Sequence, residues 1–392
     1  MISVQAQEVL TAHWRDPGFT CPNSRTYPWL WLWDSCFHSI VWAQLGDTER
    51  ALSELTTALS AQDSDGFIPH VLYLDGSTDH ELFWGRAHTS SITQPPIYGH
   101  AIAELARGGT AIPADLLDRA TAGFNFLFES RRRSSAGLIE LVHPWESGCD
   151  HSPRWDDLVL GSSAFDEQVW YRRKGELLHG IQRSPSGAPI SNDEFAVGSV
   201  AFSAMTAFCA TELAGVTGDT ALLRHAAEVS AALAERWEPE LRTWVDDGPT
   251  AAGSGRVRTV EALLPLLTID AMGGGTRAMT QAVAGLVADE LCDIQAFAGE
   301  FGSRQVHLDE PTYLPTTYWR GPSWPQLNYL LWLGLKRVGK FAEAAHLARR
   351  SRLGAQRSGL AEYWDADTAR PGGAVPQSWT TLAICMEQSG DA

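Results

Sequence analysis

The feature that most constrains the fold of this chain is a repeated helical pattern. Apolar residues recur every three to five positions through most of the sequence, whereas the two-residue alternation typical of strands is scarce. Several patterned segments are separated by only two residues, as at Gly46-Asp47, Gly218-Asp219 and Gly339-Lys340. Because such short connections place successive helices antiparallel, the pattern predicts a fold made of helical hairpins.

Twelve segments carry the pattern. The one that begins at Phe195 is expected to be an amphipathic helix that turns its apolar stripe inward and ends at Gly215. Twelve helices make six hairpins, and six hairpins closed in a ring make an all-α (α/α)6 barrel, a single domain over residues 1–392. The expected helices cover residues 2–13, 33–46, 47–61, 92–108, 114–132, 195–215, 220–236, 257–270, 276–288, 322–338, 340–356 and 376–388.

Residues 133–193 interrupt this rhythm. They are rich in Trp, Pro, Gly and charged residues, and we interpret them as an insertion that caps the active-site mouth of the barrel. The run Arg131-Arg132-Arg133 just before the insertion is expected to be a solvated helix end.

Composition excludes several classes of function. The chain has 30 basic and 47 acidic residues and a net charge of −17, which argues against nucleic-acid binding. Its first residues lack a signal peptide's basic and apolar regions, and no run of apolar residues approaches the roughly 18 that span a membrane. The six cysteines form no C-x-x-C pair, which favours a reduced, cytoplasmic protein. No metal or other cofactor is expected, since no His pair shows ligand spacing, and a homo-oligomer is left open.

Tryptophan is unusually frequent, with 16 residues against 8 Tyr and 14 Phe. Indole faces stack on the C–H side of sugar rings, while carboxylate, amide and guanidinium groups hold the hydroxyls, so their combination predicts a sugar pocket. We therefore expect most of the excess Trp to line one mouth of the barrel, with Trp42, Trp237, Trp244 and Trp332 serving as packing. The segments concerned, four of which combine Trp with such groups, are 27–35, 91–96, 143–156, 318–325, and 362–365 with 376–379.

Two of these segments are specific enough to carry a resemblance. The run from Trp145 to Asp156, WESGCDHSPRWD, and the run from Tyr318 to Trp324, YWRGPSW, resemble bacterial members of glycoside hydrolase family 63. The resemblance extends from Tyr27 to Trp379 in the same order and is strongest to glucosylglycerate and mannosylglycerate hydrolases. It implies an (α/α)6 barrel with an inserted region over the site, in agreement with the hairpin count. It also implies an enzyme that hydrolyses a small α-glucoside or α-mannoside with inversion.

By this resemblance Asp150 matches the general acid and Glu362 the general base. Relatives carry an acidic or amide residue and an Asn where this chain has Gly198, Ser199 and Ser203, so the choice of substrate within the family is open. The candidates for an arginine that binds a glycerate carboxylate are Arg172, Arg173 and Arg183. The resemblance assigns substrate contacts to Tyr27, Trp33, Asp34, Gln94, Trp145, Gly148, Trp319, Arg320, Gly321, Trp324 and Gln377.

The inverting reaction needs two carboxyl groups roughly 6.5–9.5 Å apart, one protonated and one ionised, with room for a water between them. Trp145 and Trp155 beside Asp150 would raise the pKa of that carboxyl by lowering the local dielectric, and Arg154 would oppose this if it pointed inward. Glu146 is a rival acid, for which we favour a structural role in orienting the loop.

Two other functions remain open from the residues alone. A sugar isomerase or epimerase can use the same toroid with His acid/base pairs, and a sugar-binding protein would need no pair of placed carboxylates. At Asp34, capping of the following helix is the alternative to sugar binding.

Overall fold

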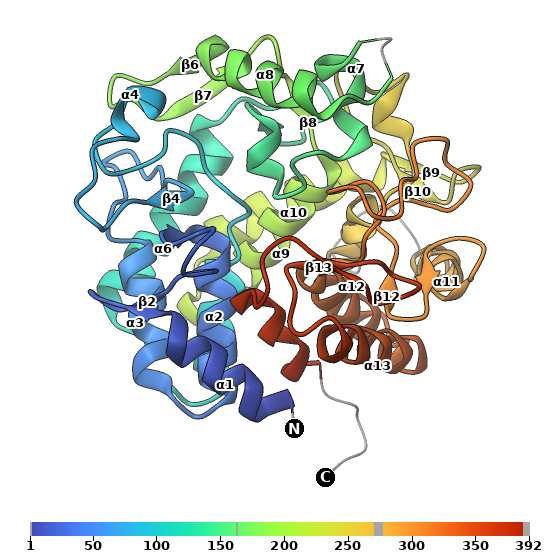
Figure 1. The fold of residues 1–392 in the computed structure, drawn as a ribbon. Coiled ribbons are helices and arrows are strands. Elements are labelled where there is room, and N and C mark those ends of the chain that lie inside the picture. The colour runs from blue at the N-terminus through green and yellow to red at the C-terminus, as the bar shows by residue number, and fades with distance from the viewer. Residues whose placement is uncertain (1, 162–163, 270–276, 387–392) are drawn as a thin grey trace.

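We describe a computed structural model of the chain, which defines residues 2–161, 164–269 and 277–386. This part of the chain is mostly helical (Figure 1). The α-helices are α1 (Ile2–His13), α2 (Leu32–Gln44), α3 (Thr48–Ala58), α4 (Glu81–Trp84), α5 (Tyr98–Arg107), α6 (Ala114–Asn125), α7 (Asp156–Val159), α8 (Glu167–Leu177), α9 (Val200–Thr217), α10 (Thr220–Ala234), α11 (Arg277–Cys292), α12 (Pro325–Arg337) and α13 (Phe341–Arg357). The same residues also form a π-helical turn, η1 (Phe126–Ser130), and the 3-10 helices η2 (Pro144–Ser147), η3 (Pro153–Trp155), η4 (Leu178–Gly180), η5 (Ser254–Arg256), η6 (Glu261–Leu267) and η8 (Ser378–Ile384).

Six of these elements form a closed cycle of contacts. α2 packs on α5, α5 on α9, α9 on η6, η6 on α12, α12 on η8, and η8 returns to α2. Each alternates along the chain with an element that packs outside the cycle, namely α1, α3, α6, α10, α11 and α13. Among elements that follow one another in the chain, the most extensive contacts are those of α2 with α3, α9 with α10, and α12 with α13. The hairpins expected at the three short Gly turns are therefore present.

Side-chain burial separates the two sets of elements. Every residue of η6 and η8 is buried, and α2 and α12 are buried almost throughout, whereas α3, α10 and α13 bury one face. The prediction of an amphipathic helix after Phe195 is wrong in this respect, because α9 is buried around most of its circumference. A helix that is apolar all round belongs inside a protein, and here α5, α10 and η6 surround it.

The twelve expected segments correspond to these twelve elements, with shifted boundaries where proline or glycine intervenes. The segment 92–108 becomes helical only from Tyr98, because Pro95-Pro96 cannot donate helical hydrogen bonds. Pro265 lies within η6, which is a 3-10 helix and not an α-helix. α9 ends at Thr217 rather than Gly215, because Gly218 is the residue that adopts the left-handed conformation suited to a helix end. The expected limits at residues 270, 276 and 388 lie outside the described residues.

Short antiparallel strands join the loops to one another. These strands are too brief to have shown a two-residue alternation in the sequence. The pairs are β1 (Trp14–Arg15) with β2 (Phe19–Thr20), β3 (Leu30–Trp31) with β4 (Val71–Leu72), β5 (Glu140–Leu141) with β8 (Val197–Gly198), β6 (Ile181–Arg183) with β7 (Pro189–Asn192), β9 (Trp237–Glu238) with β10 (Thr243–Trp244), β11 (Ala298–Gly299) with β12 (Gly302–Ser303), and β13 (Tyr363–Trp364) with β14 (Pro371–Gly372).

Among the described residues, α9 is the one helix whose length and composition would also suit a membrane span. Most of it is buried by neighbouring helices, which is the environment of a core helix in a globular fold.

The residues expected to form an insertion contain η2, η3, α7, α8, η4 and the hairpin of β6 and β7. In Figure 1 α8, β6 and β7 lie along the side of the molecule away from both termini. A buried ion pair anchors this segment, since both guanidinium nitrogens Nη1 and Nη2 of Arg131 bind the carboxylate of Glu146 at 2.6 and 2.8 Å. The prediction of a solvated end at Arg131 is therefore wrong, because its partner lies fifteen residues further along the chain.

We expect Arg131→Met to lower the free energy of unfolding by about 3–5 kcal/mol, because the Glu146 carboxylate would stay buried without its cation. The matched control is Arg132→Met, since the Arg132 side chain is 34% exposed and its ion pairs contribute about 1 kcal/mol or less. Urea and thermal unfolding measure both. Equal stability of the two variants would contradict the structural role of the buried pair.

Candidate active site

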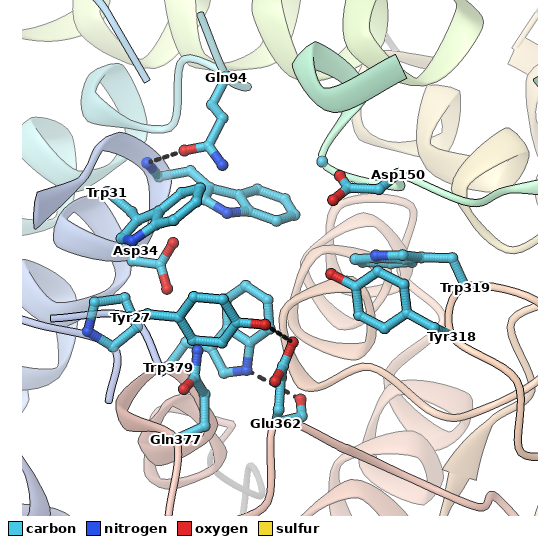
Figure 2. A pocket seen from close by; sticks show the side chains of 13 residues that line it. Tyr27, Trp31, Asp34, Gln94, Asp150, Tyr318, Trp319, Glu362, Gln377 and Trp379 are labelled. Atoms are coloured by element: carbon cyan, nitrogen blue, oxygen red, sulfur yellow. Dashed lines mark hydrogen bonds between the residues drawn. The ribbon is translucent and has the colours of Figure 1, made fainter. Parts of the chain in front are cut away.

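One pocket gathers most of the residues singled out in the sequence. It has a volume of about 450 Å³, part of it open to solvent, and most of its lining residues lie at or just before the start of an element of the contact cycle. Nine of the thirteen predicted site residues line it, together with four that were not assigned: Pro22, Trp31, Tyr318 and Trp379 (Figure 2). The nine are Tyr27, Trp33, Asp34, Gln94, Gly148, Asp150, Trp319, Glu362 and Gln377.

Glu362 enters the pocket from the start of the β13–β14 hairpin. Its carboxylate accepts a hydrogen bond from the backbone N–H of Ala374 at 2.9 Å and one from the Tyr27 hydroxyl at 3.3 Å. Its backbone carbonyl accepts the indole N–H of Trp379 at 3.0 Å. Figure 2 shows the bonds from Tyr27 and Trp379, which hold the carboxyl group beside the open part of the pocket. Three segments of the chain therefore fix its orientation.

Asp150 lies on another wall, in the loop after η2 (Figure 2). Trp155, expected near it, donates its indole N–H to the carbonyl of Cys149 and so stabilises that loop. Arg154 does not act on Asp150 as expected, because its guanidinium binds Asp246 at 2.8 Å. The cation whose charge acts on Asp150 is Lys174, which bonds to the next residue, His151.

Burial raises the pKa of both carboxyl groups. The pKa of Asp150 is raised to about 6, with Lys174 and the Tyr318 hydroxyl opposing the effect of burial. The pKa of Glu362 is raised to about 7, although the bonds from Ala374 and Tyr27 favour its ionised form, and the charge of Asp150 raises it further. Between about pH 6 and about pH 7 the pair therefore holds about one proton, which these values place mainly on Glu362, so combined acid and base catalysis uses the less populated arrangement in which Asp150 carries it.

Four indoles wall the pocket: Trp31, Trp33, Trp319 and Trp379. Trp33 packs against Trp379 with ring centres 5.8 Å apart and also touches Gly148, where a Cβ atom would come within 2.5 Å of its ring. The backbone of Gly148 has φ +71°, so both space and conformation require glycine there.

Trp319 lies on a second indole. Its ring stacks on Trp324 with centres 3.5 Å apart and planes 3° from parallel, and its backbone has the positive φ of 57° that is uncommon for a large residue. Trp324 therefore supports Trp319 from behind and does not line the pocket. An indole held this firmly presents a fixed flat face to a ligand.

Polar groups without partners point to a ligand. Among the described residues, Asp34 Oδ1, Gln377 Oε1 and the indole nitrogens of Trp31 and Trp319 are buried and lack a hydrogen-bond partner. Buried polar groups are nearly always bonded, so these four are available to an incoming molecule with hydroxyl groups. Asp34 does not cap α2, because the N-cap position is Trp31 and no side chain caps it.

Four predicted site residues do not line the pocket: Trp145, Arg320, Gly321 and Trp324. Arg320 is buried and binds Asp156 through two nitrogens at 2.9 and 2.5 Å, which ties the Trp319 loop to the loop of Asp150. Gly321 packs against the backbone of Leu314. Arg320, Gly321 and Trp324 therefore lie behind the lining, although they belong to the same run of sequence as Trp319.

None of the three arginine candidates for a substrate carboxylate lines the pocket. Arg172 is exposed, Arg173 pairs with Glu176 and Glu194, and Arg183 bonds to Ser91. Lys174 was not singled out from the sequence, because it follows Arg172 and Arg173 and such a run of basic residues is usually exposed to solvent. Its spacing of four from Trp170, on the buried face of α8, was the available signal.

The segment that departs from the family pattern has structural roles here. Ser199 caps α9 by accepting the N–H of Phe202, and Ser203 accepts the N–H of Ile139 at 3.0 Å. Gly198 pairs in β8 with β5, where a Cβ atom would come within 2.5 Å of Ser134 Oγ. None of the three residues lines the pocket.

One group in the described part of the chain has the spacing of a metal site: His100, Glu104 and Glu212 offer ligand atoms within 4.8 Å of one another. Arg107 binds both carboxylates, and Tyr329 bonds to His100, so these groups already have partners within the protein. They lie apart from the pocket residues.

The tryptophans do not gather at the mouth to the expected extent. Four of the 16 line the pocket and Trp324 supports one of them, while Trp155 and Trp364 are buried with their indole nitrogens bonded to backbone carbonyls. The packing role predicted for Trp42, Trp244 and Trp332 is confirmed by their burial, and Trp237 is half-buried. The expectation that most of the excess lines the mouth is wrong.

Comparisons with known proteins give a family and relatives that match most of the chain. Residues 27–380 match the family model described as the mannosylglycerate hydrolase MGH1-like glycoside hydrolase domain. The chain is 29% identical to the glucosylglycerate hydrolase of Mycolicibacterium hassiacum, with 91% of each chain covered. It is 28% identical to the mannosylglycerate hydrolase of Thermus thermophilus, with 96% and 98% covered.

Solved structures give the same result. A glycoside hydrolase family 63 mannosylglycerate hydrolase from Thermus thermophilus, in complex with Tris and D-glycerate, matches with a TM-score of 0.83, 27% identity, and 98% and 99% of the two chains covered. Neutral trehalase from Saccharomyces cerevisiae shares the fold at 14% identity, with a TM-score of 0.60 and 99% and 80% covered.

The fold and the pocket are thus those of a glycoside hydrolase. More specifically, the chain belongs to the mannosylglycerate hydrolase MGH1-like family, and its resemblance to family 63 enzymes is confirmed.

We expect Gly148→Ala to lower kcat/KM by about 10-fold or more, because the added methyl group would displace the Trp33 ring from the pocket wall. The matched control is Gly218→Ala, at φ +75° and with no atom near its Cβ position. Both variants should lose about 1 kcal/mol of stability from backbone strain. Equal activity of the two, measured by steady-state kinetics, would show that the Gly148 contact does not matter for the site.

Proposed function

We propose that the protein is an inverting α-glycosidase that hydrolyses a small α-glucoside or α-mannoside such as glucosylglycerate or mannosylglycerate. The observation that carries the proposal is the pair Asp150 and Glu362, which reach one pocket from different walls with open space between them (Figure 2). Both have pKa values near neutrality, so one can hold a proton while the other is ionised.

The chemistry assigns one step to each carboxyl group. Asp150 gives its proton to the glycosidic oxygen as the bond from that oxygen to the anomeric carbon breaks. Glu362 takes a proton from a water molecule whose oxygen forms the new bond on the opposite face of the ring. The products are the free aglycone alcohol and a sugar of inverted configuration. Tyr27 and Ala374 orient the base by their hydrogen bonds to its carboxylate.

The lining of the pocket supports a sugar of one ring with a small aglycone. Four indoles offer apolar faces, and Asp34, Gln94 and Gln377 offer polar atoms to hydroxyl groups. The amide oxygen of Gln94 accepts the backbone N–H of Trp33 at 3.4 Å, which leaves its amide nitrogen for the ligand. Relatives that match 91% and 96% of the chain are named as hydrolases of glucosylglycerate and mannosylglycerate, and structures of one relative hold glucose or D-glycerate.

We further propose that the cycle of six inner elements and six outer ones is an (α/α)6 barrel, and that residues 133–193 cap its active-site mouth. The alternation of inner and outer elements along the chain supports the first part. The second part is supported by Gly148 and Asp150, which this segment contributes to the pocket wall.

The decisive experiment is a screen of α-glucosides and α-mannosides of glycerate, glycerol and short oligosaccharides, followed by NMR of the sugar as it forms. We expect hydrolysis of at least one glycerate glycoside with the β-anomer as the first product. A first-formed α-anomer would contradict the role of Glu362 as base. Isomerisation without release of an aglycone would identify an isomerase instead, and binding without turnover a sugar-binding protein.

Variants of the two carboxyl groups serve as controls of the same experiment. Asp150→Asn and Glu362→Gln should each lower kcat by about 10²–10⁴-fold with the fold intact, since each removes one proton transfer. Glu8→Gln, an exposed carboxylate on α1, should leave activity unchanged. An active Asp150→Asn enzyme would exclude the proposed acid.

We expect a narrow, bell-shaped pH dependence of kcat/KM, with limbs near pH 6 and pH 7. Below the lower limb both carboxyl groups are protonated and the base is lost. Above the upper limb both are ionised and the acid is lost. A profile that is flat between about pH 5 and about pH 8 would show that these two groups do not control the reaction.

A further inference from the structure

Lys174 lies within α8 with its ammonium group enclosed. The residue is 1% exposed, and its Nζ donates to His151 Nε2 at 2.9 Å. The same nitrogen faces three aromatic rings, with centres at 5.0 Å for Trp145, 4.8 Å for Tyr171 and 5.9 Å for Trp170. A cation held over aromatic faces keeps much of its field, because no water screens it.

The backbone at this position is also fixed. The Lys174 carbonyl accepts a hydrogen bond from His143 Nε2 at 2.9 Å, and His143 is the residue that caps η2. His151 follows Asp150 directly, so one side chain links the ammonium group to the loop of the acid. The position of the cation is therefore set by the same segment that positions Asp150.

The charged groups around Lys174 come from three parts of the chain. Burial lowers the pKa of Lys174 to about 8, although Asp150 and Glu167 favour its charged form. Burial, Lys174 and Arg320 lower the pKa of His151 to about 2, which keeps the imidazole neutral and able to accept the hydrogen bond. Around Asp150 the other titratable groups are Tyr27, Cys149, Tyr171, Tyr318 and Glu362.

Resting on the proposed function, we infer that Lys174 is a positioning residue that acts through Asp150. Its ammonium group, held by His151 and the aromatic rings, stabilises the carboxylate that forms on Asp150 when the acid gives up its proton. The step is a proton transfer from Asp150 to the leaving oxygen, and no proton leaves Lys174.

Burial of Asp150 explains why a nearby cation would assist its proton transfer. A carboxylic acid in an apolar pocket keeps its proton well, but its carboxylate product is then poorly stabilised and the acid is a poor donor. A fixed positive charge held beside the loop of the acid, as Lys174 is through His151, lowers the cost of proton transfer without any reorganisation during the reaction. None of the thirteen predicted site residues supplies this charge, since Arg320 is bound to Asp156.

The test compares two leaving groups in Lys174→Met. Hydrolysis of an alkyl α-glycoside needs the proton of the acid, whereas an α-glycosyl fluoride of the same sugar releases fluoride with little such help. We expect kcat on the alkyl glycoside to fall by about 10–100-fold, and kcat on the fluoride to change by about 2-fold or less. The pH profile on the alkyl glycoside should move to higher pH, because the pKa of Asp150 rises without the neighbouring charge.

Lys174→Arg keeps the charge and should keep both the ratio of the two rates and the pH profile close to those of the unaltered enzyme. Lys336→Met is the matched control, because that lysine also lies over an indole, Trp332, at 4.3 Å but outside the pocket lining. If Lys174→Met does not fold, Lys174→Gln is measured in its place.

An equal loss on both substrates, with an unmoved pH profile, would show that Lys174 is merely structural and would overturn the inference. Unchanged activity on both would overturn it as well. These outcomes are separate from failure of the proposed function, because that function fails if Asp150→Asn remains active on the alkyl glycoside.

Discussion

The Glu146 carboxylate is the point on which the geometry of the site depends. It is fully buried and accepts four hydrogen bonds, two from Arg131 and one each from the backbone N–H groups of Thr93 and Val142. Thr93 immediately precedes the pocket residue Gln94, and Glu146 itself lies four positions before Asp150. A single ion pair therefore sets two walls of the pocket relative to each other. Because each partner would be buried and uncompensated without the other, the pair gives this segment a narrow choice of conformations.

Burial also gives the site its chemistry. Burial alone would leave two carboxyl groups neutral and inert, so each is matched by groups that favour its ionised form to a limited extent. Glu362 has the Tyr27 hydroxyl and the Ala374 N–H, while Asp150 has the Tyr318 hydroxyl and the field of Lys174. Both pKa values end near neutrality, where small changes in the environment move a proton from one carboxyl to the other. The surrounding indoles serve two purposes, since they exclude water and offer flat faces to a sugar.

The sequence predicts the positions of the six inner and six outer elements because helical periodicity and Gly turns are local signals. Its errors have local causes too, since Pro95-Pro96 and Pro265 restrict the backbone in ways that an apolar pattern does not show. The motifs predict which segments meet at the pocket, but not which side chain of each points inward. Trp324 and Arg320 belong to the same run as Trp319, yet they lie behind it. Arg131 was expected to be solvated and Lys174 was not assigned to the site, and both have a different explanation. Their burial depends on partners that only the tertiary structure brings close.

The cycle of inner elements closes through the contact of η8 with α2. The pocket consequently joins residues from the first tenth of the chain, such as Tyr27 and Asp34, to residues from its last tenth, such as Glu362 and Gln377. During synthesis on the ribosome the earlier helices can pair as hairpins before Glu362 and Gln377 have been made. The pocket is then completed in a late step, when the final segment packs against α2. An interrupted chain consequently lacks one wall of the pocket, whatever structure its hairpins have already gained.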